Sequence, residues 1–290
     1  MQASIMGTER TIAVLSGKGG TGKTLVSVNL ASAASSAAYM DCDVEEPNGQ
    51  LFFRPAVIDE KVIAVGRPAV DQKLCNGCHI CSNACAFNAL AVLKDQLLIF
   101  EELCHSCGLC IHLCPQRALT EVQKPLGVVR KGSSGTVSFF SAEMHIGESS
   151  GVPLIKALMK QKPAGLVVID CPPGSGCMVT ESIAKADFCL LVSEPTIFGA
   201  HNLAMVHELA NLVGKPCGVL LNKTQEGSNP SEDYARTHNL PIIGSLPYDK
   251  DLARMTTEGL IASRESNCYR QVFADLLKEV MDASDPDSKR

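Results

Sequence analysis

The sequence contains no tryptophan, and aromatic residues make up only 4% of its 290 residues. A protein that binds single-stranded nucleic acid by stacking the bases needs exposed aromatic rings. Positive charge is also scarce, because 26 lysines and arginines are outnumbered by 31 aspartates and glutamates, for a formal net charge of −5. The composition therefore argues against a protein that binds nucleic acid or other polyanions in general.

The sequence also lacks segments that would direct it into a membrane. Residues 1–10 have no basic stretch followed by an apolar one, as a signal peptide would. The longest apolar runs, such as residues 165–169, have the length of a strand and cannot span a bilayer. The helix expected at residues 264–282 has mixed charge and no basic face. We therefore expect a cytoplasmic protein without membrane insertion.

Cysteine is abundant, with 14 residues in the chain. Disulfides are rare in the cytoplasm, so these cysteines need another explanation. Eight of them fall within residues 75–114, and this clustering indicates bound metal. The remaining composition, 46% hydrophobic and 20% charged, is typical of a globular protein. The length suits one sizeable domain and a second small one.

Apolar runs of strand length alternate with helical patterns over most of the chain. We expect strands at residues 11–15, 39–42, 165–170, 188–192 and 217–221, and helices at residues 23–36 and 202–213. This alternation predicts an α/β fold with a doubly wound, mostly parallel sheet. A Cys-rich segment interrupts it. We therefore divide the chain into an α/β domain at 1–66 and 125–282, an inserted domain at 67–124, and a flexible tail at 283–290.

A phosphate-binding loop follows the first expected strand and precedes the first expected helix. Residues 17–24, GKGGTGKT, fit the pattern G-x-x-x-x-G-K-[ST]. In such a loop, backbone N–H groups surround phosphate oxygens at the positive end of a helix. Lys23 should reach the β- and γ-phosphates, and the Thr24 hydroxyl should bind Mg²⁺. The residues predicted to bind ATP here are Gly17, Gly19, Gly20, Thr21, Gly22, Lys23 and Thr24.

The loop carries a second lysine, Lys18, and in this it resembles the deviant Walker A family that includes MinD, ParA, Mrp and the nitrogenase iron protein. The resemblance covers nearly the whole chain outside the Cys-rich insert and implies a P-loop ATPase of the MinD/ParA type. In that family the extra lysine reaches the nucleotide of a partner subunit. For Lys18 this implies a role like that of an arginine finger, across a nucleotide-dependent homodimer or a heterodimer with a related ATPase. The alternative is a solvent-exposed loop lysine.

The same resemblance assigns roles to acidic residues at the ends of later strands. Asp41 and Asp43 would lie in switch I, where Asp41 helps to order the Mg²⁺ site and Asp43 orients or deprotonates the attacking water. In switch II, Asp170 would hold Mg²⁺ through water, and the Gly174 N–H would donate to the γ-phosphate. A strand-end aspartate that caps a turn is the alternative for Asp170.

Three further residues have roles only by resemblance. Asn222 and Pro247 correspond to residues that contact the adenine ring, although both could be ordinary turn residues. Cys177 lies seven residues after Asp170, as does a cluster-binding cysteine in the nitrogenase iron protein. No second cysteine is present around residues 147–151, so a structural role for Cys177 is favoured. The other cysteines outside the insert, including Cys268, are expected to be buried or half-buried.

The insert contains two cysteine runs of identical C-x2-C-x2-C-x3-C spacing, which resemble two-cluster bacterial ferredoxins. In those ferredoxins the fourth cysteine of each run binds the other cluster. The resemblance implies a small α+β ferredoxin-like domain with two [4Fe–4S] clusters. Zinc is the alternative, although zinc needs only four ligands in two short pairs. One cluster would be bound by Cys75, Cys78, Cys81 and Cys114, and the other by Cys104, Cys107, Cys110 and Cys85.

MinD-like ATPases with an inserted ferredoxin domain resemble the sequence most closely overall. The resemblance implies an ATP-hydrolysing protein that couples nucleotide state to electron transfer through two clusters. Its partner would be a redox protein or a small metal-cofactor carrier protein. One alternative is a carrier or assembly factor for iron–sulfur or other metal clusters. A second is a MinD/ParA-like positioning ATPase, against which the missing membrane helix and the added clusters weigh.

Overall fold

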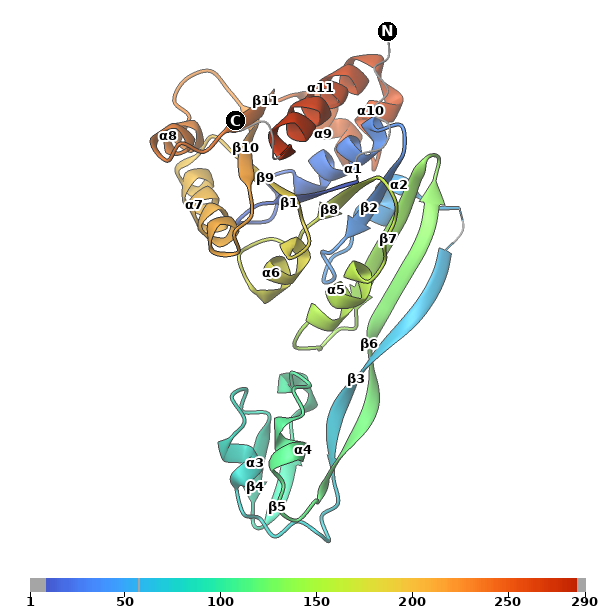
Figure 1. Cartoon of the computed structure of the whole chain (residues 1–290), viewed down its shortest axis with the longest axis vertical. Helices are drawn as coiled ribbons and strands as arrows, with labels where there is room; N and C mark the ends of the chain where they lie inside the picture. Colours follow the sequence, from blue (N-terminus) through green and yellow to red (C-terminus); the bar gives the residue numbers. More distant parts are fainter. Residues whose placement is uncertain (1–8, 57, 286–290) are drawn as a thin grey trace.

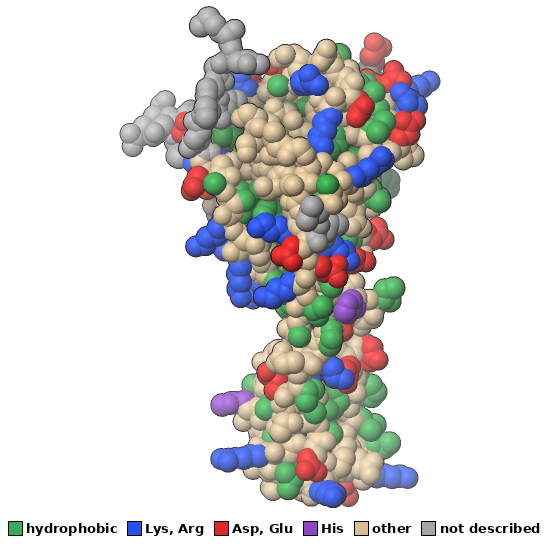
Figure 2. Space-filling view, turned by 90° about the vertical axis from the view of Figure 1, so that its right-hand side faces the viewer, with side chains coloured by type: hydrophobic (Ala, Val, Ile, Leu, Met, Phe, Trp, Pro, Cys, Tyr) green, Lys and Arg blue, Asp and Glu red, His purple; other side chains and the backbone are tan. Residues whose placement is uncertain are grey.

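The computed structural model describes residues 9–56 and 58–285 of the chain. Figure 1 shows a large α/β body and a small lobe, which a long two-stranded ribbon connects. In the space-filling view of Figure 2 the molecule narrows to a waist between these two parts. The lobe is therefore attached along a limited surface, and contacts at the waist determine how it is held.

A mostly parallel sheet forms the centre of the large body, as the alternating pattern predicted. Within the described residues the strand order is β11-β10-β9-β1-β8-β2-β7-β6-β3, and only β6 and β3 pair antiparallel to their neighbours. The parallel strands are β1 (Arg10–Leu15), β2 (Ala37–Asp41), β7 (Val137–Met144), β8 (Leu166–Asp170), β9 (Phe188–Ser193), β10 (Cys217–Thr224) and β11 (Ile242–Pro247). The carboxyl ends of these strands meet at one edge, where ligands bind in open α/β sheets.

Helices cover both faces of the sheet, which explains why the central strands are continuous apolar runs. All five residues of β8 are buried, for example. One face is covered by α1 (Lys23–Ala33), α2 (Gly49–Phe53), α9 (Lys250–Thr257), α10 (Ala262–Glu265) and α11 (Asn267–Ser284). The other face is covered by α5 (Val152–Met159), α6 (Cys177–Ile183), α7 (Ile197–Leu212) and α8 (Pro230–Thr237).

Several element ends differ from the sequence prediction. Helix α1 ends at Ala33, three residues early, because Ala34 is already extended and leads into β2. Helix α7 begins at Ile197, before the expected residue 202, because the Thr196 hydroxyl accepts a hydrogen bond from the Gly199 N–H (2.8 Å) and caps the helix. Local backbone and capping geometry therefore moved these boundaries by three and five residues.

The end of the chain also differs from its prediction. The single helix expected at 264–282 is divided into α10 and α11, because the backbone of Ser266 is extended. Helix α11 continues to Ser284, and its buried residues Phe273 and Val280 pack on the sheet. Residues 283–284, expected to belong to a flexible tail, are thus helical, and residues 286–290 lie outside the described part of the chain.

The ribbon consists of β3 (Ile58–Val70) and β6 (Leu119–Ser134), paired antiparallel along their length. Its inner end continues the main sheet through β7, and its outer end carries the lobe. Only a few buried apolar residues form the lobe core in the described structure: Cys81, Leu90, Leu97 and Leu119. The lobe elements are α3 (Ile80–Asn83), β4 (Leu90–Leu93), β5 (Gln96–Ile99), the 3₁₀ helix Glu101–Leu103 and α4 (Leu109–Leu113).

None of the helices in the described part of the chain combines the length and apolar character that crossing a bilayer requires.

Asn29 joins α1 to α10 inside the large body. Its side chain is fully buried, its amide donates to the Leu25 carbonyl (2.8 Å), and its carbonyl oxygen accepts from the Ser263 N–H (2.7 Å). Asn29→Ala leaves the Ser263 N–H without a partner and should cost about 2 kcal/mol of unfolding free energy. Urea unfolding followed by circular dichroism measures this. The exposed Asn211→Ala should change it by less than about 0.5 kcal/mol, and equal effects of both changes would contradict the prediction.

Candidate functional site

The glycine-rich loop connects β1 to α1 and has a backbone that requires glycine. Gly20 and Gly22 have φ values of 79° and 101°, in the left-handed region that residues with a side chain rarely adopt. A Cβ on Gly22 would also lie 2.3 Å from the Asn222 amide nitrogen. Lys23 follows as the first residue of α1 and is 7% exposed. The loop and the helix start are thus arranged as in a phosphate-binding site.

Asp41 and Asp170 lie side by side at the carboxyl edge of the sheet, because β2 and β8 pair in register at these two residues. Each is only 1% exposed. Asp170 accepts hydrogen bonds from the hydroxyls of Tyr39 (3.0 Å), Ser27 (3.3 Å) and Thr24. The structure thus brings together Thr24 and Asp170, two of the three residues predicted to serve the Mg²⁺ site, and the third, Asp41, lies beside Asp170. Sequence reasoning missed Ser27 and Tyr39. Their spacing could have indicated them, because Ser27 lies three residues after Thr24 on a helix and Tyr39 lies two residues before Asp41 on a strand.

Burial changes the pKa values of both aspartates. Burial raises the pKa of Asp170, while the hydrogen bond from Thr24 and the charge of Lys23 oppose the shift. Burial also raises the pKa of Asp41 well above its usual value, and the negative charge of Asp170 adds to the effect. Two neighbouring buried carboxylates favour a cation between or beside them, because a cation removes the cost of both charges.

Asp43 lies at the opening of this group. Burial, reinforced by the charge of Asp170, raises the pKa of Asp43 to about 6, and Lys23 acts in the opposite direction. A carboxyl group with a pKa near neutrality suits proton exchange with water. The Gly174 N–H, predicted to face the γ-phosphate, donates here to the Ser16 carbonyl (3.0 Å). That amide therefore has to exchange partners before it can contact a phosphate.

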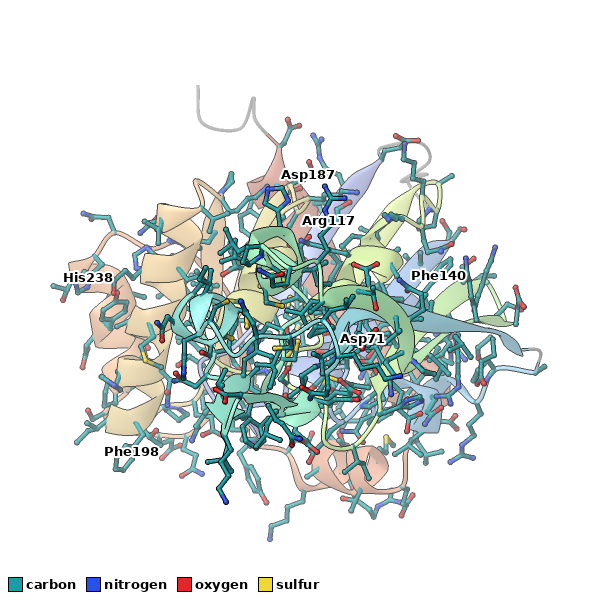
Figure 3. The ribbon with its side chains drawn as sticks, turned by 90° about the horizontal axis from the view of Figure 1, so that it is seen from below. Asp71, Arg117, Phe140, Asp187, Phe198 and His238 are labelled. Atoms are coloured by element: carbon teal, nitrogen blue, oxygen red, sulfur yellow. The ribbon has the colours of Figure 1, made fainter. Side chains whose placement is uncertain are left out.

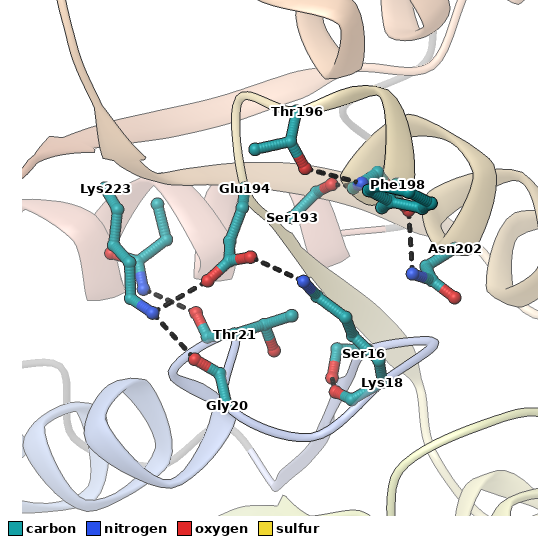
Figure 4. A network of polar contacts seen from close by, with 12 residues as sticks. Ser16, Lys18, Gly20, Thr21, Ser193, Glu194, Thr196, Phe198, Asn202 and Lys223 are labelled. Atoms are coloured by element: carbon teal, nitrogen blue, oxygen red, sulfur yellow. Dashed lines mark hydrogen bonds and ion pairs between the residues drawn. The ribbon is translucent and has the colours of Figure 1, made fainter.

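Lys18 takes part in a charged network rather than extending freely into solvent (Figure 4). Its ammonium lies 2.8 Å from one Glu194 oxygen, and the Lys223 ammonium lies 2.7 Å from the other. Lys223 also donates to the Gly20 carbonyl (2.7 Å). Partial burial disfavours the Glu194 charge, but the hydrogen bonds from the two lysines outweigh this and lower its pKa. Glu194 directly follows the last residue of the buried strand β9, and this position could have marked it as a candidate.

The two residues predicted at the adenine differ in their surroundings. Asn222 is 2% exposed, and its amide donates to the Thr21 carbonyl (2.7 Å), so it holds the loop in shape. Pro247 is exposed at the end of β11. The buried hydroxyl of Thr21 has no hydrogen-bond partner in the described structure, which fits a loop that receives a polar ligand. A groove extends from Thr24 along α2 to the end of α9 and the two residues after it, with Arg54 and Glu258 in its wall.

The lobe contains two cavities, and each is lined by four cysteines. The cysteines of one cavity are Cys75, Cys78, Cys81 and Cys114. Those of the other are Cys85, Cys104, Cys107 and Cys110. These are the two predicted ligand sets, including the exchange of the fourth cysteine between runs. In Figure 3, which views the molecule from the lobe end with Asp71 and Arg117 in the foreground, sulfur atoms gather near the centre.

The two cysteine runs adopt the same local backbone. Each residue of the first run lies 29 positions before its counterpart, as in 75 to 104 and 85 to 114. Positive φ angles recur at the same offset, at Gly77 and Ser106, His79 and Gly108, and Asn88 and Arg117. In each half an N–H four residues later donates to the fourth cysteine sulfur: Ala89 to Cys85 (3.4 Å) and Ala118 to Cys114 (3.3 Å). N–H donors around a sulfur stabilise a thiolate.

In the described residues no group of three or more His, Cys, Asp or Glu side chains is gathered closely enough to hold a metal ion. The four cysteines around each cavity therefore do not meet at one point, as the ligands of a zinc ion do. The thiolates of a [4Fe–4S] cluster bind different irons and surround a cavity, so the donor set and the two cavities fit such a group.

The cysteines outside the lobe are less uniform than expected. Cys42, Cys171 and Cys189 are buried, and burial raises the pKa of each thiol. Cys268 is exposed, so the expectation that it is buried or half-buried was wrong; it lies on the solvent side of the first turn of α11. Cys177 is also exposed, at the first residue of α6.

The chain is similar to known proteins over nearly its whole length. A family model described as the CobQ/CobB/MinD/ParA nucleotide binding domain matches residues 12–262. An uncharacterized protein of Methanocaldococcus jannaschii is 29% identical over 283 residues, which cover 95% of this chain and 98% of that protein. A second uncharacterized protein of the same organism is 26% identical over 262 residues, covering 86% and 89%.

Solved structures show the same fold. The septum site-determining protein MinD of Pyrococcus horikoshii, complexed with Mg-ADP, aligns with a TM-score of 0.59 at 19% identity, covering 94% of this chain and 96% of that one. The cell division ATPase MinD of Pyrococcus furiosus gives 0.58 at 19% identity, covering 94% and 98%. At this identity the likeness concerns the fold.

Asn222 offers a test of how the glycine-rich loop is held. Asn222→Ala removes the hydrogen bond to the Thr21 carbonyl, which is worth about 1 kcal/mol. The affinity for Mg-ADP, measured by calorimetry, should fall by roughly fivefold. Thr224→Ala is the matched control. Thr224 lies on the same strand as Asn222, but its hydroxyl is hydrogen-bonded to the Ser245 hydroxyl on β11 (3.0 Å) and not to the loop. An unchanged affinity in Asn222→Ala would show that the loop keeps its shape without this support.

Proposed function

The chain belongs to the CobQ/CobB/MinD/ParA nucleotide-binding family, and from that premise we propose that it is an ATP-hydrolysing iron–sulfur protein. In this proposal the nucleotide state of the large body governs two [4Fe–4S] clusters held in the lobe. The observation that carries it is the pair of cysteine-lined cavities, each drawing three cysteines from one run and the fourth from the other. Membership of a family that includes the MinD/ParA ATPases supports ATP hydrolysis.

The large body supplies the residues that ATP and Mg²⁺ require. Lys23 and the glycine-rich loop would hold the phosphates, and the Thr24 hydroxyl beside Asp170 would hold Mg²⁺, which neutralises charge on the phosphates. Asp43 would orient the attacking water and accept its proton. Asp41 already accepts the N–H groups of Asp43 (3.2 Å) and Gly49 (2.7 Å), so it would fix the switch I backbone. Its part in the Mg²⁺ site would be indirect.

Lys18 would act on the nucleotide of a second subunit, either in a homodimer or in a heterodimer with a related ATPase. In the single chain Glu194 holds it near the glycine-rich loop. An exposed apolar pair, Ile197 (77%) and Phe198 (74%), forms the start of α7, and Figure 4 shows Phe198 near this network. Exposed apolar residues next to a nucleotide site suit a subunit interface. Dimer formation would cover them and give Lys18 a phosphate as its new partner.

The small core and the cysteine content of the lobe support bound clusters. Its buried core is small for an independently folding unit, and small domains of this kind depend on metal or disulfides. None of the eight cysteines that line the cavities forms a disulfide in the described structure, so disulfides do not supply this support. The eight cysteines that line the cavities match the number that two clusters need. The clusters would supply one-electron chemistry and folding free energy.

We expect about eight irons per chain after anaerobic reconstitution, and substitutions should remove clusters in the crosswise pattern. Cys78→Ser and Cys114→Ser should lose the same cluster, and Cys107→Ser and Cys85→Ser the other. Iron analysis and electron paramagnetic resonance of the reduced protein measure this. The exposed Cys268→Ser, outside the lobe, should keep the full iron content. If Cys114→Ser resembled Cys107→Ser instead, each run would bind its own cluster, and a protein that stayed iron-free would end the proposal.

The role of Lys18 can be tested by mixing two inactive variants. Lys18→Ala and Asp43→Asn should each bind ATP and hydrolyse almost none. In a mixed dimer, the Lys18→Ala subunit keeps its own Asp43 and receives the intact Lys18 of its neighbour. Equal mixing should therefore restore about a quarter of the unaltered rate. Phosphate release measures it, and no recovery under conditions where mixed dimers form would contradict action across the interface.

A positioning ATPase of the MinD/ParA kind is the second candidate, and the comparisons with solved structures favour it over the redox function. The two candidates predict different ligands. ATP-dependent binding of the reconstituted protein to lipid vesicles or DNA would support positioning. For the redox function, ATP should change the rate of cluster oxidation by an acceptor while the iron stays bound. If iron and sulfide moved to the acceptor instead, the protein would be a cluster carrier.

A further inference from the structure

Arg67 is a buried charge that neither the nucleotide site nor the cysteine cavities explain. It lies on β3 near the outer end of the ribbon and is 3% exposed. A buried arginine is stable only when its guanidinium is fully hydrogen-bonded or paired. Here it donates to the backbone carbonyls of Glu101 and Cys104 in the lobe and forms an ion pair with Glu148. One side chain therefore joins the ribbon, the lobe and the large body.

Glu148 belongs to the loop at residues 145–151, which connects β7 to α5 in the large body. The neighbouring Ser149 hydroxyl donates to the same Cys104 carbonyl (2.9 Å). Cys104 is the first cysteine of the second run and lines the cavity of Cys85, Cys107 and Cys110. The loop thus holds the backbone at one predicted cluster ligand, where the large body meets the lobe. We call Arg67, Glu148, Ser149 and the Cys104 carbonyl the waist junction.

The other end of this loop contacts both nucleotide switches. A Cβ on Gly151 would lie 2.3 Å from Val44 Cγ2 and 3.0 Å from Met178 Sδ, so no space separates these groups. Val44 follows Asp43 in switch I, and its carbonyl accepts the Met144 N–H (2.8 Å) at the end of β7. Met178 is the second residue of α6, which follows the switch II segment. A displacement of either switch has to move Gly151, because close-packed groups transmit rather than absorb motion.

From these contacts we propose that the waist junction couples the nucleotide switches to the backbone of the Cys104 loop, with Arg67 as the positioning residue. The motion at Val44 and Met178 would move residues 148–149, and these would release or re-aim the Cys104 carbonyl. The proposal rests on the proposed function for its claim that Cys104 binds a cluster. Its mechanical part, a response of residues 101–107 to nucleotide, depends only on the contacts described.

Hydrogen–deuterium exchange of the full chain, with and without a non-hydrolysable ATP analogue and Mg²⁺, tests the coupling without requiring iron. In the unaltered protein, nucleotide should change exchange at residues 41–46 and at residues 101–107, the latter by about tenfold. Arg67→Lys keeps the charge but cannot reach three acceptors at once. In Arg67→Lys and in Ser149→Ala the response at 41–46 should remain, and the response at 101–107 should be lost.

Arg130→Gln is the matched control. Arg130 lies on the same ribbon and pairs with Glu60 (2.7 Å) and Glu143, neither of which belongs to the lobe. It should keep both responses. Coupling is overturned if nucleotide alters 41–46 but not 101–107 in the unaltered protein, or if the distant response survives in Arg67→Lys. Iron content, measured on the same samples, separates failure of the cluster proposal from failure of the coupling.

Iron-loaded samples give a second readout. In the unaltered protein and in Arg130→Gln, ATP should shift the midpoint potential of the cluster bound by Cys104, because hydrogen bonding and solvent around the sulfurs set that potential. Arg67→Lys should bind as much iron but show no shift with ATP. A shift of equal size in Arg67→Lys would overturn the role assigned to this residue, and a merely structural role would change iron content without changing the response to ATP.

Discussion

The register between β2 and β8 is the constraint on which the rest of the structure depends. It places Asp41 beside Asp170 at the carboxyl edge of the sheet, with the glycine-rich loop following β1 next to them. Two buried carboxylates so close together are stable only near positive charge, which Lys23 supplies from α1. A shift of one residue would turn the aspartates to opposite faces and leave the lysine without its partners. Strand pairing thus positions the acidic residues of the nucleotide site.

The small lobe depends on the large body in a different way. Its own apolar core is limited, and its position relative to the sheet is set by the ribbon and by the buried contacts of Arg67. The guanidinium of Arg67 is buried, so breaking its contacts without replacing them would cost several kcal/mol. The lobe can therefore change its position only if Arg67 exchanges one set of partners for another.

The sequence was sufficient for five of the parallel strands and for the glycine-rich loop, because each depends on short-range pattern. It did not predict β7, β11 or the long ribbon strands β3 and β6, and the domain limits expected at residues 67 and 124 fall inside these two ribbon strands. Apolar runs such as residues 166–169 identify strands directly, and GKGGTGKT carries its own geometry. The contacts of Glu194 and Arg67 could not be predicted in the same way, because their partners are distant in the sequence. Glu194 pairs with Lys18, 176 positions away (194 − 18), and Arg67 pairs with Glu148, 81 positions away (148 − 67). Helix ends were missed where a single cap, such as Thr196, decides them.

The ribbon has one more consequence. Residues 58 and 132 are paired at its inner end, so the insert leaves the sheet and returns to it through adjacent, hydrogen-bonded strands. A segment whose two ends are already neighbours adds little closure entropy to its host, whatever its length. An α/β domain of this kind could therefore acquire, lose or exchange an inserted domain without changing its core. This edge of the sheet is a site where insertion is tolerated.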